Sequence, residues 1–171
     1  MVSRIDWRSV AIAVVAMLVV GFVVGALINM VTTSMLMAYA RENSVASAGA
    51  FMLGVNSVVA CLQGLIYGAV IGAAYAWLAS RRESLEAGDA LVGAAITALA
   101  YLVLATILGL CTTTMGMAWT YQAEGIQVDP ENLGSLAFGI LSGVLLHTVI
   151  EGIALLIAAL PTAMLVARGR R

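Results

Sequence analysis

The stretch ACLQGLIYGAVIGAAYAWLAS, residues 60–80, decides the fold of this chain. It carries no charged residue, and a helix needs about 20 apolar residues to cross the hydrocarbon core of a bilayer. The stretch therefore predicts a membrane-spanning helix. Small residues also recur along it at every fourth position: Ala60, Gly64, Gly68, Gly72, Ala76 and Ser80.

The rest of the chain has the same character. Hydrophobic residues make up 63% of the 171 residues and charged residues 10%, a balance that excludes a water-soluble domain. Four predominantly apolar runs, 10–40, 45–79, 90–121 and 133–167, are each longer than one crossing requires. We predict an all-α integral membrane protein, a four-transmembrane-helix bundle that forms a single membrane domain over residues 1–171. Asp89 is placed to cap the third helix, and VDPEN predicts that the fourth begins near Pro130.

The distribution of arginine predicts the orientation. All eight basic residues are arginine. Only Arg41 lies on the side of the membrane opposite to the termini, in the connection between the first and second spans. The others lie before the first span, between the second and third, or after the fourth: Arg4, Arg8, Arg81, Arg82, Arg168, Arg170 and Arg171. Because positive charge is retained inside, both termini are expected in the cytoplasm. We expect the plasma (inner) membrane of a prokaryote, with outer loops near residues 41–48 and 122–131.

Two pairs of matching segments indicate an internal repeat. TTSMLMAYA at 32–40 resembles TTTMGMAWT at 112–120, and LQGL at 62–65 resembles IEGI at 150–153. The predicted repeats are residues about 9–82 and about 89–171. Each holds two spans, so both copies have the same orientation and are related by an axis along the membrane normal. In this alignment Glu151 occupies the place of Gln63.

Small residues in the spans predict close helix packing, because they let backbones approach each other. The first and fourth spans carry shorter rows than residues 60–80, and the row in the fourth continues to His147 and Glu151. We expect these shorter rows to pack the bundle, whereas the row at 60–80 is long enough to serve a partner or a second copy as well. The predicted packing positions are Gly21, Gly25, Gly64, Gly68, Gly72, Gly139 and Gly143.

The segment LLHTVIEGIALL, residues 145–156, contains the only histidine and a glutamate four positions later. Residues four apart share one helix face. At a rise of about 1.5 Å per residue, Glu151 lies ~25 Å from Arg168, in the outer third of the bilayer. Other polar residues fall in the same layer, which predicts a ligand or proton site; the alternative is a satisfied buried pair that fixes the fourth helix. The predicted site residues are His147, Glu151, Gln63, Asn56, Asn29, Thr32, Thr33, Thr112 and Thr113.

Sulfur-containing residues are concentrated in the same outer region. Thioether, thiol and imidazole groups are ligands that copper(I) favours, but methionine is also a common gap filler between helices. The spacing matches no recognised metal site, and the sequence leaves open whether the two cysteines are free or bridged. The candidate ligands are Met35, Met37, Met115, Met117, Cys61, Cys111 and His147.

The sequence contains no recognised catalytic motif. Three functions remain. We expect a non-enzymatic protein that requires no cofactor. Short loops and small-residue faces favour an accessory or assembly subunit within a larger membrane complex. The first alternative is a small oligomeric transporter or channel with a polar site around His147 and Glu151. The second is binding of a quinone, a pigment or copper at the outer face. Expected partners are the lipid bilayer and other membrane subunits or further copies of the chain, with no nucleic acid.

Overall fold

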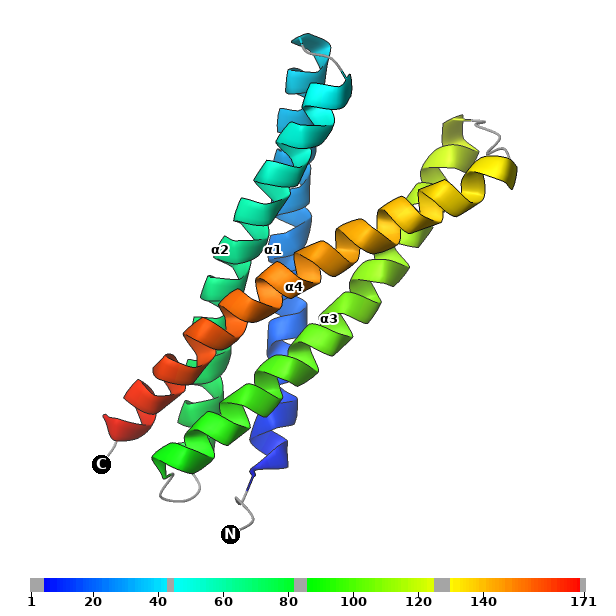
Figure 1. The fold of residues 1–171 in the computed structure, drawn as a ribbon. Helices are drawn as coiled ribbons and strands as arrows, with labels where there is room; N and C mark the ends of the chain where they lie inside the picture. Colours follow the sequence, from blue (N-terminus) through cyan, green and yellow to red (C-terminus); the bar gives the residue numbers. More distant parts are fainter. Residues whose placement is uncertain (1–4, 43–44, 82–85, 125–129, 170–171) are drawn as a thin grey trace.

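The computed structural model describes residues 5–42, 45–81, 86–124 and 130–169, and these residues are helical apart from short helix-flanking positions. The helices are α1 (Trp7–Glu42), α2 (Val45–Ser80), α3 (Ala87–Glu124) and α4 (Pro130–Arg168) (Figure 1). Each contains a segment long and apolar enough to cross a membrane: Trp7–Thr32, Leu53–Ser80, Ala87–Met115 and Leu141–Arg168. The prediction of a helical four-span membrane protein is confirmed.

Local sequence explains where the helices begin. The Asp6 carboxylate accepts hydrogen bonds from the backbone N–H groups of Arg8 and Ser9 and from the Ser9 hydroxyl, at 3.1, 3.3 and 2.6 Å. It thereby caps the first turn of α1. Helix α4 begins at Pro130, as predicted. The predicted cap of α3 is wrong, because α3 begins at Ala87 and Asp89 lies inside its first turn. A carboxylate there still favours the positive end of the helix dipole.

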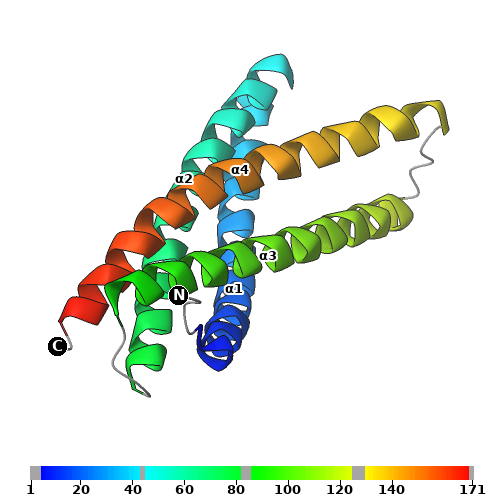
Figure 2. The ribbon, with the colours of Figure 1, turned by 60° about the horizontal axis from the view of Figure 1, so that its bottom comes forward.

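Each helix runs antiparallel to the one before it in the sequence, so the start of α1 and the end of α4 lie at the same end of the bundle (Figure 1). We call this the termini end and the opposite one the hairpin end. Helices α2 and α4 make the most extensive contact, while α1 packs on α2 and α3 but, over the described residues, not on α4. The α1–α2 and α3–α4 hairpins diverge toward the hairpin end in both views (Figures 1 and 2). The bundle is therefore closed at one end and open at the other.

The contact between α2 and α4 depends on the small-residue row of α2. A Cβ atom at Gly68 would overlap the backbone of Leu155, so only glycine permits this approach. The same holds for the pairs Gly64–Glu151 and Gly72–Ala159. The sequence left this row available to a partner or a second copy. In the structure α4 of the same chain covers it, and the α4 backbone at Glu151, Leu155 and Ala159 lies against the three glycines.

An aromatic and aliphatic core fills the termini end. Ile71 and Tyr75 of α2 are fully buried there, together with Leu155 of α4. Gly93 of α3 lies against the ring of Tyr75, and a Cβ at this position would overlap the ring. This core closes the bundle below the point at which the hairpins separate.

Candidate functional site

A cavity of about 530 Å³ lies between the two hairpins and is lined by all four helices. It gathers every described member of the predicted polar set: Thr32, Asn56, Gln63, Thr112, Thr113, His147 and Glu151. The side chains of Asn29 and Thr33 lie outside the described residues. Depth along four separate helices therefore predicted a set of side chains that the structure brings to one place. Their ligand-binding role stays a prediction.

His147 and Glu151 form the ionisable pair of the cavity. They occupy successive turns of α4, with 3.6 Å between His147 Nε2 and Glu151 Oε2. The His147 side chain is 38% exposed and that of Glu151 11% exposed. The imidazole is thus the more accessible group, and the carboxylate lies deeper among the four helices.

Gln63 of α2 also lines the cavity, together with Glu151 of α4. Both residues are 9% exposed. Gly64 follows Gln63 and lets the α4 backbone approach at Glu151, which holds the two polar positions close to one interface. The alignment of the predicted repeats pairs these same two residues.

Threonine hydroxyls add polar atoms to the cavity wall. The Thr32 hydroxyl donates to the Ile28 carbonyl at 3.0 Å, and the Thr106 hydroxyl donates to the Leu102 carbonyl at 2.7 Å. Thr106 and Thr148 also bring their hydroxyl oxygens within 3.3 Å of each other across α3 and α4. A hydroxyl that donates to its own helix retains lone pairs as acceptors. The hydroxyl protons of Thr32 and Thr106 are therefore directed to their own helices.

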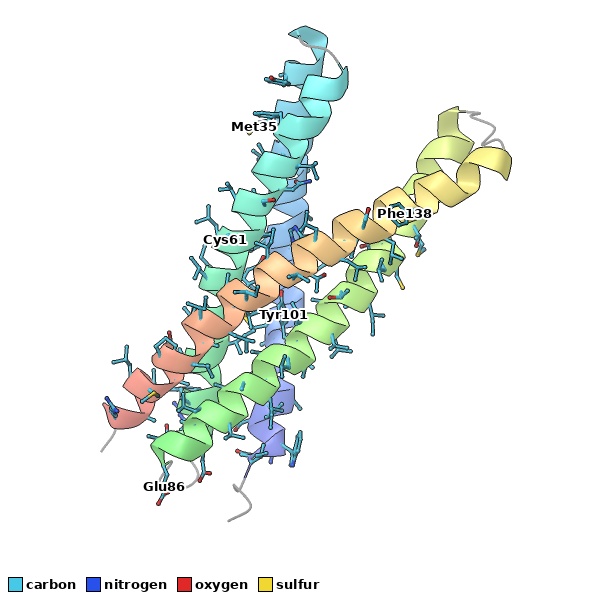
Figure 3. The ribbon with its side chains drawn as sticks, in the orientation of Figure 1. Met35, Cys61, Glu86, Tyr101 and Phe138 are labelled. Atoms are coloured by element: carbon cyan, nitrogen blue, oxygen red, sulfur yellow. The ribbon has the colours of Figure 1, made fainter. Side chains whose placement is uncertain are left out.

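Two tyrosines form the floor of the cavity. The rings of Tyr67 and Tyr101 meet edge to face, with centroids 6.0 Å apart and planes at 81°. Both residues are buried, and Figure 3 shows Tyr101 at the centre of the bundle, where α3 passes α4. The Tyr67 hydroxyl lies near the Gln63 side chain, one turn earlier in α2. The floor closes the cavity toward the termini end.

The glycines of the cavity differ from those of the α2–α4 contact. Gly25 and Gly143 line the cavity, and a Cβ at either position would have no neighbour within 4 Å. Within the described chain no helix packs closely against either glycine, because the diverging hairpins leave open space beside them. Gly21 does pack closely, since a Cβ there would lie 2.7 Å from the Tyr101 hydroxyl. Gly139 lies outside the described residues.

The sulfur-containing residues are not gathered around His147. Met35, Met115, Cys61 and Cys111 are exposed and none of them lines the cavity. Figure 3 shows Met35 and Cys61 at the margin of the molecule. The side chains of Met37 and Met117 lie outside the described residues, and both cysteines are free. Within the described ranges, no three His, Cys, Asp or Glu side chains come together as metal ligands.

Several cavity residues were missed at the sequence level, above all Tyr67, Tyr101, Thr106 and Thr148. One signal was present, because Tyr67 follows Gln63 by four residues and so shares its helix face. A comparable row on α3 has a residue at every fourth position, and all of its members line the cavity: Tyr101, Ala105, Gly109 and Thr113.

Comparison with protein-family models, with curated proteins and with solved structures finds no match for this chain. The protein is an integral membrane protein by the length and composition of its helices. The chemistry of its cavity is therefore the basis on which a function can be proposed.

Proposed function

We propose that this protein is a small transporter that receives a solute from the outer side of the membrane into the cavity between its hairpins. The observation that carries the proposal is the cavity itself, which one chain lines with polar side chains from four helices. Its volume of about 530 Å³ falls within the range of about 300–1,000 Å³ that is typical of small-molecule sites. Polar and ionisable side chains at membrane depth usually serve a substrate or ion pathway.

The arginine distribution supports an outward-facing cavity. It predicts that the termini end is cytoplasmic, so the diverging hairpin end faces outward. The tyrosine floor and the core beneath it close the cytoplasmic side. A site within the membrane that is open to one side corresponds to one state of an alternating-access cycle. The closed floor favours a transporter over a continuously open channel.

The predicted repeat supplies two bodies that can move in such a cycle. In this proposal each hairpin corresponds to one predicted repeat, and the alignment of the repeats pairs Gln63 with Glu151. Gly21 of α1 aligns with Tyr101 of α3 when the match of 32–40 to 112–120 is extended, and these two residues are in contact. Contact between matching positions supports an axis between the hairpins. Rocking of one hairpin against the other around that axis would open the floor.

Filling the cavity tests the proposal. Gly143→Phe places a ring in the open space beside Gly143, whereas Leu145→Phe changes a surface-exposed position of the same helix that does not line the cavity. Purified protein would be screened by thermal unfolding against a library of small polar and amphiphilic compounds. We expect compounds that stabilise the wild type and Leu145→Phe but not Gly143→Phe. A screen with no stabilising compound, or with equal stabilisation of Gly143→Phe, would refute the proposal.

A second candidate function is an accessory or assembly subunit of a larger membrane complex. Helix α1 supports this function because the rest of the chain covers little of it. Only 17% of its most apolar segment is buried within the protein, whereas 39% of the corresponding segment of α2 is buried. A helix so little covered offers a broad face to lipid or to another subunit. Purification in a mild detergent distinguishes the two functions. A stable heteromeric partner would favour the subunit, and a monomer or homo-oligomer would favour the transporter.

A further inference from the structure

We infer that the cavity selects organic cations, such as protonated amines or quaternary ammonium and phosphonium compounds. This inference rests on the proposed function and specifies its substrate class. Among the described side chains that line the cavity, Glu151 is the only carboxylate and none is an arginine. The wall therefore carries one acidic group with no fixed cation other than the neighbouring histidine.

The hydrogen-bonding character of the wall is consistent with a positively charged solute. The Glu151 carboxylate and the side-chain carbonyl oxygens of Asn56 and Gln63 are hydrogen-bond acceptors in this wall. An ammonium group is a donor without an acceptor, so acceptor-rich walls suit it. A carboxylate solute would be repelled by the Glu151 carboxylate.

The floor adds aromatic surface close to the carboxylate. Tyr67 and Tyr101 both lie near Glu151, and the two rings are perpendicular to each other. Aromatic rings attract cations through their negative faces, and sites for quaternary ammonium groups are commonly built from such rings. Phe22 supplies a third ring higher in the cavity. One carboxylate with several rings is a combination that favours a cation with apolar substituents.

His147 lies beside the carboxylate in the cavity. It lies 3.6 Å from Glu151 and is the more exposed of the two side chains. A neutral imidazole there can accept a hydrogen bond from an ammonium group that the carboxylate attracts.

The test compares two ions of nearly equal shape and opposite charge. Binding of tetraphenylphosphonium and tetraphenylborate to the purified full chain would be measured by equilibrium dialysis, with protein-free micelles as the blank. Triphenylphosphine oxide serves as the neutral reference compound. We expect the phosphonium to bind best, and Glu151→Gln to weaken its binding by at least about tenfold, since even a partly screened charge pair exceeds about 1.4 kcal/mol. Leu145→Gln, outside the cavity, should bind as the wild type does.

A gain-of-charge variant covers the case in which Glu151→Gln fails to fold. Gln63→Glu adds a carboxylate at the matching position of α2 and should raise the preference for the phosphonium over the borate. Equal binding of the phosphonium, the borate and the neutral oxide would overturn the charge selection but leave the transporter proposal standing. Failure of all three compounds to bind the folded wild type would overturn the selection, while the compound screen described above would decide separately on the cavity. Unchanged preference in both variants would also overturn the role of Glu151.

Discussion

Replacement of Gly68 by alanine tests the packing of the bundle most sharply. A Cβ atom at this position would overlap the carbonyl oxygen of Leu155 and lie 2.9 Å from its carbonyl carbon and Cα. These are backbone atoms of α4, so no side chain can rotate away to relieve the overlap. The two helices must separate along their most extensive contact. We therefore expect Gly68→Ala to destabilise the protein.

The matched control gives the magnitude. Gly25→Ala adds the same methyl group to α1, where no atom lies within 4 Å. Replacing glycine by alanine within a helix favours the helix by about 0.8–1 kcal/mol, and this contribution is common to both variants. Overpacking disfavours Gly68→Ala alone, by about 1–3 kcal/mol. The free energy of unfolding should thus be lower for Gly68→Ala than for Gly25→Ala by about 1–3 kcal/mol.

Unfolding in mixed micelles by titration with sodium dodecyl sulfate, followed by far-ultraviolet circular dichroism, measures this difference. The midpoint of Gly25→Ala should equal or exceed that of the wild type, and the midpoint of Gly68→Ala should be lower than both. If Gly68→Ala proved as stable as Gly25→Ala, the close approach of α2 and α4 would be refuted.

Three further predictions follow from the topology and from local contacts. Reporter fusions after Arg171 and after Gln127 should lie on opposite sides of the membrane, and a shared side would exclude four spans. The free energy of unfolding should be lower for Gly93→Ala than for Gly25→Ala by about 1–3 kcal/mol, because a Cβ there overlaps the Tyr75 ring; equal stability of the two variants would contradict that contact. Asp6→Ala should cost about 1 kcal/mol in the same titration through loss of the α1 cap, whereas an unchanged midpoint would show that the cap is dispensable.

The helices were predictable because length and hydropathy determine membrane spans almost independently of tertiary contacts. The start of α4 at Pro130 was predictable for a local reason, the tolerance of proline in the first turn. The start of α3 was not, since Asp89 is favourable both as a cap and inside the first turn. Residues that govern helix ends thus specify a position to within a turn.

Depth in the bilayer could be counted along the chain, but direction around each helix could not. Cys61 shares the depth of Gln63 yet lies two residues away, about 200° around the helix, and only Gln63 lines the cavity. The same limit applies to Gly25 and Gly68, because each belongs to a row in which small residues recur at every fourth position. Whether another backbone lies beside each depends on where the hairpins diverge, and that is a property of the packed bundle.

The central claim is that water from the outer side reaches a polar cavity inside the membrane, and one accessibility measurement tests it directly. In a background of Cys61→Ser and Cys111→Ser, single cysteines would replace His147, which lines the cavity, and Leu145, which is exposed but does not. The two positions differ in depth by only about 3 Å. A membrane-impermeant thiol reagent added outside intact cells should label His147→Cys and leave Leu145→Cys unmodified. Equal labelling of the two, or labelling of His147→Cys only in inverted vesicles, would contradict an outward-facing cavity.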